Sequence, residues 1–149
     1  MIVFVKSYLS QINNSLSAYL CPYQYKNVTD SWRKIVGRSV IGANCDKENS
    51  DFDGTTWFRF VEPAGTMLST VNPQQLSCGT DGIAWMKGRH PIMFGKVVQR
   101  TICFSWSGNK CAWSLPNTNV VACKWYNDTE FYLYQLKKPP ICALAYCAQ

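Results

Sequence analysis

The sequence predicts a mainly β fold with little helix: an antiparallel β domain stapled by disulfides, with short helical turns near its N-terminus. Short runs of β-branched and aromatic residues alternate with turn residues along most of the chain. Eight cysteines are spread over almost its whole length. Six Trp, eight Tyr and seven Phe supply bulky rings that can fill a core made of short strands. A chain of 149 residues has the length of one domain and is long enough to bury such a core.

Four strands are expected, over 57–61, 96–106, 120–126 and 131–136. The first ends at Glu62-Pro63-Ala64-Gly65, because Pro cannot donate to a strand ladder and Gly tolerates positive φ. The second is followed by a turn of hairpin length, Ser107-Gly108-Asn109-Lys110, which returns the chain to residues 111–113. The last two strands are joined across residues 127–130.

Residues 1–20 are expected to be a leader or a frayed helix, with the domain proper at 21–149. Five apolar residues share one face at near-helical spacing: Leu9, Ile12, Leu16, Tyr19 and Leu20. The apolar run at the start is cut off by Lys6, so no signal peptide is evident, and no stretch has transmembrane length. Farther on, Asp30 or Thr29 could cap a short helix that ends at Gly37.

The cysteine pattern predicts a framework of up to four disulfides. An even number without a C-x-x-C pair, and with a single histidine, provides neither a zinc ligand set nor a thioredoxin-type redox motif. Disulfides persist in oxidising compartments, so we expect an extracellular, secreted or cell-surface chain; eight buried thiols in a cytosolic protein are the alternative. The pairing stays open, since eight cysteines allow 105 connectivities. The residues are Cys21, Cys45, Cys78, Cys103, Cys111, Cys123, Cys142 and Cys147.

Three sequons agree with secretion and make Asn13, Asn27 and Asn127 candidate N-glycosylation sites. The net charge of +6 comes from scattered basic residues, with Arg33-Lys34 and Lys137-Lys138 as the adjacent pairs. We expect a solvated basic surface that could attract acidic glycans weakly, and no nucleic-acid partner, because no arginine-rich run or nucleic-acid motif accompanies the charge.

Residues 44–54 are expected to form a solvated acidic loop. Its Asp51-x-Asp53-Gly54 order is reminiscent of calcium loops but fails the EF-hand template, so no metal is expected. Asp46 and Glu48 complete the acidic set, and nothing in the sequence raises the pKa of one of these carboxyls for acid–base catalysis.

His90 is the one histidine, and a hydrolytic triad around it is the enzymatic alternative. No G-x-S-x-G elbow is present, and Pro91 follows His90 directly in a turn-like stretch. A structural histidine is therefore the favoured interpretation. We expect no enzyme and no cofactor, since phosphate-binding and dinucleotide-binding motifs are also missing from the sequence.

The aromatic residues leave a second binding hypothesis open. Trp57, Trp85 and Trp113 could stack on the apolar face of sugars, although filling the core is the commoner role of such rings. The residues thus favour a non-catalytic extracellular module, with a carbohydrate-binding domain as the alternative.

Several motifs in order resemble one family. Its WYRF and AGTxM signature is similar to Trp57-Phe58-Arg59-Phe60 followed by Ala64-Gly65-Thr66-Met67. Its CGT and WlnGxHP motifs are similar to Cys78-Gly79-Thr80 followed by Trp85-Met86-Lys87-Gly88-Arg89-His90-Pro91. Two further stretches extend the match, which covers about residues 21–147. One is Cys103-x-x-Trp106 with Cys111. The other runs from Phe131 to Cys147 and contains the elements FYxYxL, PPxC and AYC. These motifs are similar to the uromodulin-like cysteine-rich domain, shared with the pancreatic secretory-granule membrane glycoprotein and other zona-pellucida-containing proteins.

The resemblance implies a structural or adhesive module of a secreted or membrane-anchored mosaic glycoprotein, whose partners are extracellular proteins or glycans, including microbial adhesins. Two departures stand out. The uromodulin pattern has ten cysteines, with one near 70–72 and one beside Cys111, where this chain has Lys110. The family's W-x-N-G-x-H-P stretch also carries a sequon whose glycan binds bacterial fimbrial adhesins, and Lys87 stands at that position here. Any decoy glycan must therefore be displayed elsewhere, for example on Asn27 or Asn127.

Overall fold

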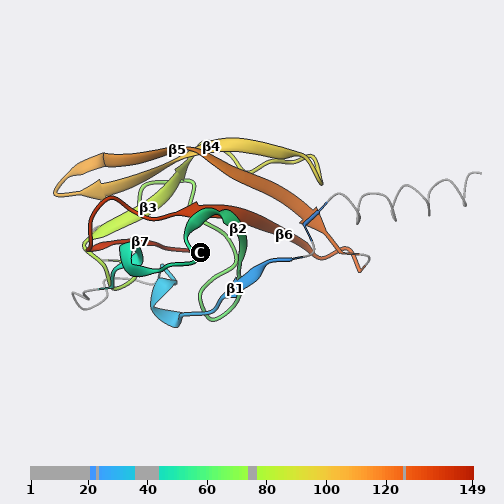
Figure 1. Cartoon of the computed structure of the whole chain (residues 1–149), viewed down its shortest axis with the longest axis horizontal. Helices are drawn as coiled ribbons and strands as arrows, with labels where there is room; N and C mark the ends of the chain where they lie inside the picture. The colour runs from blue at the N-terminus through green and yellow to red at the C-terminus, as the bar shows by residue number, and fades with distance from the viewer. Residues whose placement is uncertain (1–20, 23, 36–43, 74–76, 126) are drawn as a thin grey trace, which may run out of the picture.

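The computed structural model describes residues 21–22, 24–35, 44–73, 77–125 and 127–149, which form one curled seven-stranded sheet with two 3₁₀ turns (Figure 1). The expected leader or frayed helix at 1–20 lies outside the described residues. The elements are β1 Lys26–Val28, η1 Ser31–Arg33, η2 Asp46–Glu48, β2 Asp53–Phe60, β3 Gly82–Lys87, β4 Val97–Trp106, β5 Asn109–Lys124, β6 Glu130–Lys137 and β7 Leu144–Tyr146.

The strand order is β1-β2-β6-β5-β4-β3-β7. The five central strands pair in antiparallel fashion, and only the two outermost strands pair in parallel, β1 with β2 and β7 with β3. This arrangement confirms the mainly β, antiparallel fold class with short helical turns near the N-terminus.

The β4–β5 hairpin is the longest feature of the sheet and runs along one side of the molecule (Figure 1). Trp106 pairs with Asn109 across a two-residue turn, in which Ser107 and Gly108 have φ of 45° and 85° as a hairpin turn of this kind requires. The predicted strand 96–106 and its turn are thus confirmed. β5 begins eleven residues earlier than the predicted strand at 120, and its Pro116 lies where the register of the pairing shifts.

Three strands were not predicted: β1, β3 and β7. Two of them are only three residues long, too short for an alternating pattern to emerge. β3 contains Gly82, Ala84 and Met86, which have little intrinsic preference for strands but fit where the sheet is buried. The short helix expected to reach Gly37 ends instead at Arg33, because Lys34 is extended and forms a bridge with Ala148.

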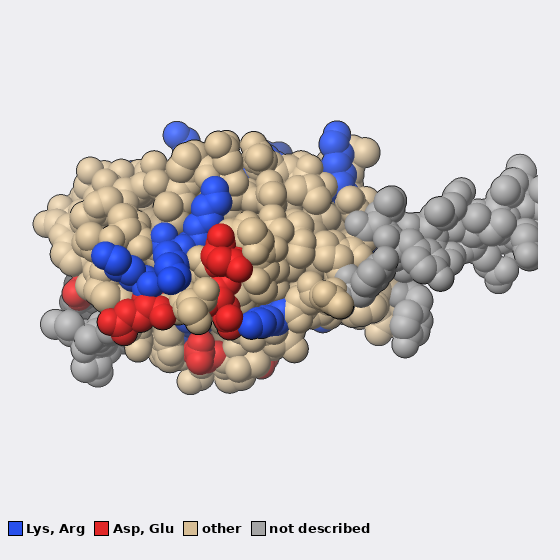
Figure 2. Space-filling model, in the orientation of Figure 1, with Lys and Arg blue, Asp and Glu red and all other residues tan. Residues whose placement is uncertain are grey.

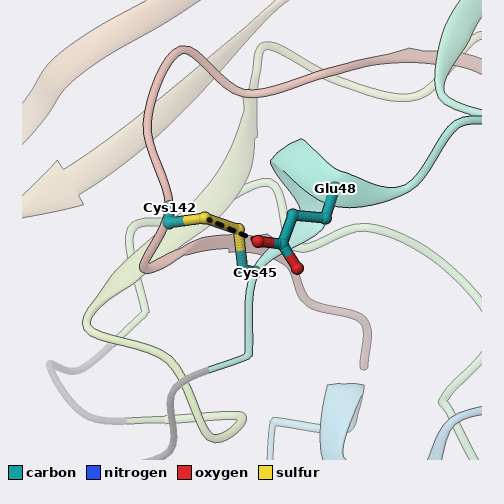
Figure 3. Close-up of side chains that lie close together, drawn as sticks. All are labelled: Cys45, Glu48 and Cys142. Carbon is teal, nitrogen blue, oxygen red and sulfur yellow. Dashed lines mark hydrogen bonds between the residues drawn. A yellow bond between two sulfur atoms is a disulfide. The ribbon is translucent and has the colours of Figure 1, made fainter.

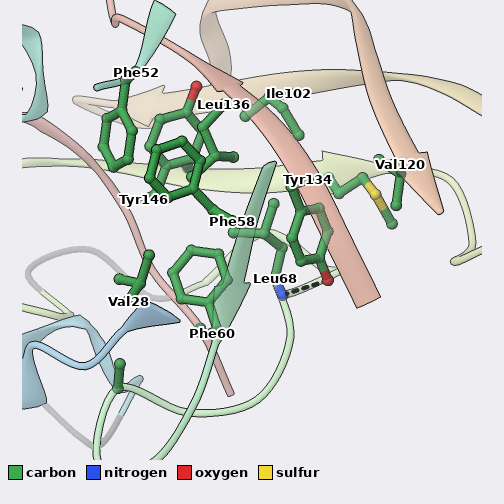
Figure 4. Packing of buried hydrophobic residues seen from close by; sticks show 14 of the residues in the cluster. Val28, Phe52, Phe58, Phe60, Leu68, Ile102, Val120, Tyr134, Leu136 and Tyr146 are labelled. Atoms are coloured by element: carbon green, nitrogen blue, oxygen red, sulfur yellow. Dashed lines mark hydrogen bonds between the residues drawn. The ribbon is translucent and has the colours of Figure 1, made fainter. Parts of the chain in front are cut away.

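The principal core lies on the inner face of the curled sheet, where aromatic rings meet edge to face (Figure 4). Tyr146 is packed between Phe52 and Phe104 at centroid distances of 5.4 and 5.7 Å. Tyr134 packs on Phe60, and its hydroxyl accepts a hydrogen bond from the Leu68 backbone N–H. The aromatic side chains thus fill the core as the composition predicts.

A second apolar cluster covers the opposite face of β5 and β6. We call it the outer cluster; it consists of Cys21, Val121, Cys123, Phe131 and Leu133, with Tyr25 and Trp57 packed against it. The two clusters are on opposite faces because successive strand residues alternate, as Val120 and Val121 do.

A buried ion pair closes the edge of β7. Arg33 donates two hydrogen bonds of 2.7 Å to the carboxylate of Asp46, and the two side chains are only 4% and 3% exposed. Asp46 also accepts the N–H of Tyr146, and Arg33 donates to the Tyr146 carbonyl. The pair therefore supplies the hydrogen bonds that a neighbouring strand would give to these two backbone groups. The prediction of solvated charges was wrong for both residues, because they complete a sheet edge assembled from distant segments.

Candidate functional site

The eight cysteines form four disulfides and none is free. Three of the bonds tie Cys21, Cys45 and Cys78 to the last third of the chain, over sequence separations of 102, 97 and 69 residues. The fourth crosses the β4–β5 hairpin over 8 residues. The pairs are Cys21–Cys123, Cys45–Cys142, Cys78–Cys147 and Cys103–Cys111. The disulfide frame formed by these four bonds therefore cross-links segments that are far apart in the sequence.

Cys45, Glu48 and Cys142 lie together in a group that resembles a metal site (Figure 3). Their potential ligand atoms are all within 4.8 Å of one another. Both sulfurs, however, are joined in a disulfide, which has no thiolate to offer a metal. The 3.9 Å between Cys142 Sγ and Glu48 Oε1 is a packing contact, because a disulfide sulfur has no hydrogen to donate. In the oxidised chain Glu48 is left as the one carboxylate of this group.

His90 is held by aromatic residues. Its Nε2 is hydrogen-bonded at 2.8 Å to the Tyr134 hydroxyl, which also accepts the Leu68 N–H. The ring also lies 4.2 Å from that of Tyr132. Burial, with a smaller contribution from Arg100, lowers the pKa of His90 to about 4 and keeps it neutral. No serine or carboxylate is recorded as a hydrogen-bond partner of His90 in the described part of the chain, so the triad weighed as the enzymatic alternative has no partners there.

Trp57 lies at a groove beside the β1 edge of the sheet. The groove is lined by Pro22, Gln24, Tyr25, Lys26, Thr55, Thr56 and Trp57. Two aromatic rings beside hydroxyl, amide and ammonium groups are a combination that can bind sugars, since rings pack on apolar C–H faces and polar groups bind hydroxyls.

The three tryptophans singled out for sugar stacking do not form one platform. Trp85 lies on β3, separated from the β2 residue Trp57 by three strands, and its Nε1 donates to the Lys110 carbonyl at 2.7 Å. Trp113 packs against the principal core and meets Trp106 edge to face at 5.5 Å. Of the three, only Trp57 lines the groove.

Three of the four acidic residues of the loop, Glu48, Asp51 and Asp53, are exposed or half-exposed as the sequence predicts, and Asp46 is the buried exception. Asp51 pairs with Lys26 at 2.8 Å, and Asp53 accepts the backbone N–H groups of Thr55 and Thr56. These hydrogen bonds lower the pKa of Asp53 to about 2. On the face shown in Figure 2, basic and acidic side chains adjoin each other and most of the surface is uncharged.

Sequence comparison identifies the family. A family model for the uromodulin-like eight-cysteine domain matches residues 58–148. The chain belongs to the uromodulin-like eight-cysteine domain family. It is 36% identical over 123 residues to uromodulin of Rattus norvegicus, covering 83% of this chain and 17% of that protein. Over 103 residues it is 36% identical to the pancreatic secretory granule membrane major glycoprotein GP2 of Canis lupus familiaris, covering 69% of this chain and 18% of that protein.

The chain therefore spans less than a quarter of the length of these relatives. Membership of the uromodulin-like family and the four disulfides together fit an extracellular glycoprotein module. Within the described ranges, no helix has the length and apolar character needed to span a bilayer.

The sequons of this uromodulin-like chain lie at different kinds of position. Asn13 is outside the described residues. Asn27 is exposed on the edge strand β1, and Asn127 is exposed in the β5–β6 turn, where its side-chain oxygen accepts the Thr129 N–H at 3.2 Å. At the position of the family's own sequon, Lys87 is exposed at the end of β3.

Proposed function

We propose that the chain serves as a non-catalytic structural and adhesive module of a secreted or membrane-anchored mosaic glycoprotein. The observation that carries this proposal is the disulfide frame, in which three bonds close loops of 69 to 102 residues and fix both halves of the chain to one sheet. Cross-links of this length restrict the unfolded chain strongly and suit a domain that must survive outside the cell.

We further propose that the module spans residues 21–149, with 1–20 as a separate leader or frayed segment. The family match begins at residue 58, but Cys21 is bonded to Cys123 on β5, and β1 adds a strand to the sheet at Lys26–Val28. Both contacts support a module that begins at Cys21. A chain that starts at residue 21 should therefore unfold at the same denaturant concentration as the full chain.

An adhesion assay tests the function directly. The oxidised chain, coupled to beads, is expected to bind extracellular glycoproteins or cell surfaces, whereas reduced and alkylated chain should not. Equal binding by both forms would contradict an adhesive role that depends on the folded surface. A hydrolase screen addresses the enzymatic alternative, because an activity lost on replacing His90 by Ala, in a chain that remains folded, would contradict the non-catalytic proposal.

The second candidate function is carbohydrate binding, and the groove at Trp57 favours it. Trp57→Ala removes the ring from the groove, whereas Trp85→Ala removes a tryptophan outside it and is the matched control. A glycan array that shows binding lost only in Trp57→Ala supports a lectin-like role. Retention of binding in Trp57→Ala, or no binding by the folded chain, rules out this groove as a sugar site.

A third role, which builds on the module proposal, is the display of glycans as decoys for microbial adhesins. The exposed Asn27 and Asn127 are the described positions where such glycans could stand, since Lys87 replaces the family's sequon. Binding of fimbriated bacteria to the secreted chain should then disappear after enzymatic removal of N-glycans. Binding that survives deglycosylation would contradict the decoy role.

A further inference from the structure

The turn between β5 and β6 combines a sequon with an exposed tryptophan. Lys124, the last residue of β5, pairs with Glu130, the first residue of β6, and five residues connect them. Trp125 donates its N–H to the Thr129 carbonyl at 2.9 Å, and its own carbonyl accepts the N–H of Asp128 at 3.0 Å. Asp128 has φ of 65°, which lets the turn close with Trp125 and Thr129 opposite each other.

The Asn127 side chain is folded back over this turn. Its Oδ1 accepts the Thr129 N–H at 3.2 Å, and Thr129 is the residue that faces Trp125 across the turn. The carboxamide is therefore fixed to the same turn as the indole, two residues along the chain from Trp125. Asn127, Asp128 and Thr129 are all exposed, so the folded chain leaves room for a glycan.

Trp125 is partly unpacked although it is large and apolar. Its ring stacks on that of Phe131 at 5.3 Å and 27°, and yet 39% of the residue remains exposed. Phe131 is in turn covered by the Arg59 guanidinium at 4.2 Å. The indole thus packs against Phe131, and part of its apolar surface is exposed to solvent in the same turn as the sequon.

We propose that Asn127 is N-glycosylated and that the first N-acetylglucosamine packs on the open surface of Trp125. In the transfer, Asn127 Nδ2 forms a bond to C1 of the sugar of a polyprenyl-diphosphate-linked oligosaccharide. The C1–O bond breaks, the diphosphate leaves with the electron pair, and the amide nitrogen loses one proton. The apolar C–H face of the sugar then covers aromatic surface that water would otherwise contact.

This inference rests on the proposed extracellular function, because the oligosaccharide donor is met only in the secretory pathway. The test uses the full chain, secreted behind a signal peptide, with the other sequons removed by Ser15→Ala and Thr29→Ala. Deamidation of Asn127 to Asp by peptide N-glycosidase, read by mass, is expected to mark an occupied site. An unoccupied Asn127 in a secreted chain with four disulfides would overturn the inference and leave the proposed function standing.

The packing is tested on chain trimmed by an endoglycosidase to a single sugar, compared with the same sequence made without glycosylation. The sugar is expected to raise the folding equilibrium constant about 2- to 12-fold, the range that aromatic packing contributes beyond burial of area. The increase should vanish in Trp125→Ser. As a matched control, the effect of a single sugar on Asn27, with Thr29 restored and Asn127 changed to Gln, should be the same with or without Trp125.

An equal increase in the Trp125 and Trp125→Ser chains would overturn the packing. Because the substitution could also prevent folding, a second measurement uses the unmutated chain. NMR of the single-sugar form is expected to show sugar ring protons shifted upfield by the indole. Sugar protons at the shifts of a free glycopeptide would contradict the proposal.

Discussion

Replacing Asp46 with Asn should destabilise the chain strongly, because it removes the carboxylate that neutralises Arg33 in the core. Arg33 is 3% exposed as a residue and donates to the Tyr146 carbonyl at the edge of β7. Burial by itself lowers the pKa of Arg33, but the hydrogen bonds and charges of Asp46 and Asp30 raise it overall, so the group remains a cation. The substitution therefore leaves a buried charge with one partner, Asp30, which is itself half exposed.

The size of the effect follows from these contacts. Removing one partner of a buried pair typically costs about 3–5 kcal/mol, and we expect this for Asp46→Asn and for Arg33→Met. The double substitution Arg33→Met with Asp46→Leu leaves no buried charge behind, since the remaining carboxylate, Asp30, is half exposed. It leaves only the N–H and carbonyl of Tyr146 without partners, at about 1–3 kcal/mol each. The double change should thus cost about 2–6 kcal/mol, less than the sum of the single changes.

Urea unfolding at neutral pH, with the disulfides intact, measures the four free energies of this cycle. The neighbouring pair Lys34–Glu62 is the control, because it has a similar length, 2.9 Å, but its side chains are 37% and 57% exposed. Glu62→Gln is expected to cost no more than about 1 kcal/mol. Additive effects of the Arg33 and Asp46 substitutions, or a cost for Asp46→Asn no larger than that for Glu62→Gln, would refute the reasoning.

Two further predictions concern pH and the disulfides. The pKa of His90 is about 4 in the folded chain and 6.5 when unperturbed, so the unfolded chain takes up the proton first and stability falls as pH drops from about 6.5 to 4. We expect a loss of about 1–2 kcal/mol after allowing for partial exposure, and none in His90→Gln; an identical pH profile for both chains in urea unfolding would contradict this. Removing Cys45–Cys142 by paired Ala substitutions should cost about 4–5 kcal/mol and removing Cys103–Cys111 about 2–3 kcal/mol, because the first closes 97 residues and the second 8. Thermal or urea unfolding measures both, and an equal cost would show that loop length does not govern their contribution.

Two of the long strands, β4 and β6, could be predicted from the sequence because local pattern and local turn chemistry decide them, whereas the strand predicted at 120–126 covers only the end of β5. β4, with its Ser107-Gly108 turn, and β6 carry alternating or β-branched and aromatic residues between turn signals. β1 and β7 could not be predicted, since three residues carry no pattern and each is a strand only because a distant strand pairs with it.

For the candidate sites too, features set by neighbouring residues could be predicted, whereas features set by contacts between distant segments could not. That the cysteines would be oxidised followed from their number and spacing, but their pairing depends on how the sheet curls. The burial of Arg33 and Asp46 could not be foreseen, because each looks like an ordinary surface charge until the C-terminal strand is placed against it. The sequon at Asn127 was visible in the sequence, whereas its relation to the open face of Trp125 required the turn geometry.

Disulfide mapping of the secreted chain tests both its oxidised state and its cysteine pairing. Alkylation under denaturing, non-reducing conditions with intact mass counts free thiols, and proteolysis then identifies the linked peptides. An extracellular module of the uromodulin-like family predicts no free thiols and the links Cys21–Cys123, Cys45–Cys142, Cys78–Cys147 and Cys103–Cys111. A folded chain with most of its thiols free, or with other links, would contradict both the compartment and the frame on which the proposed function rests.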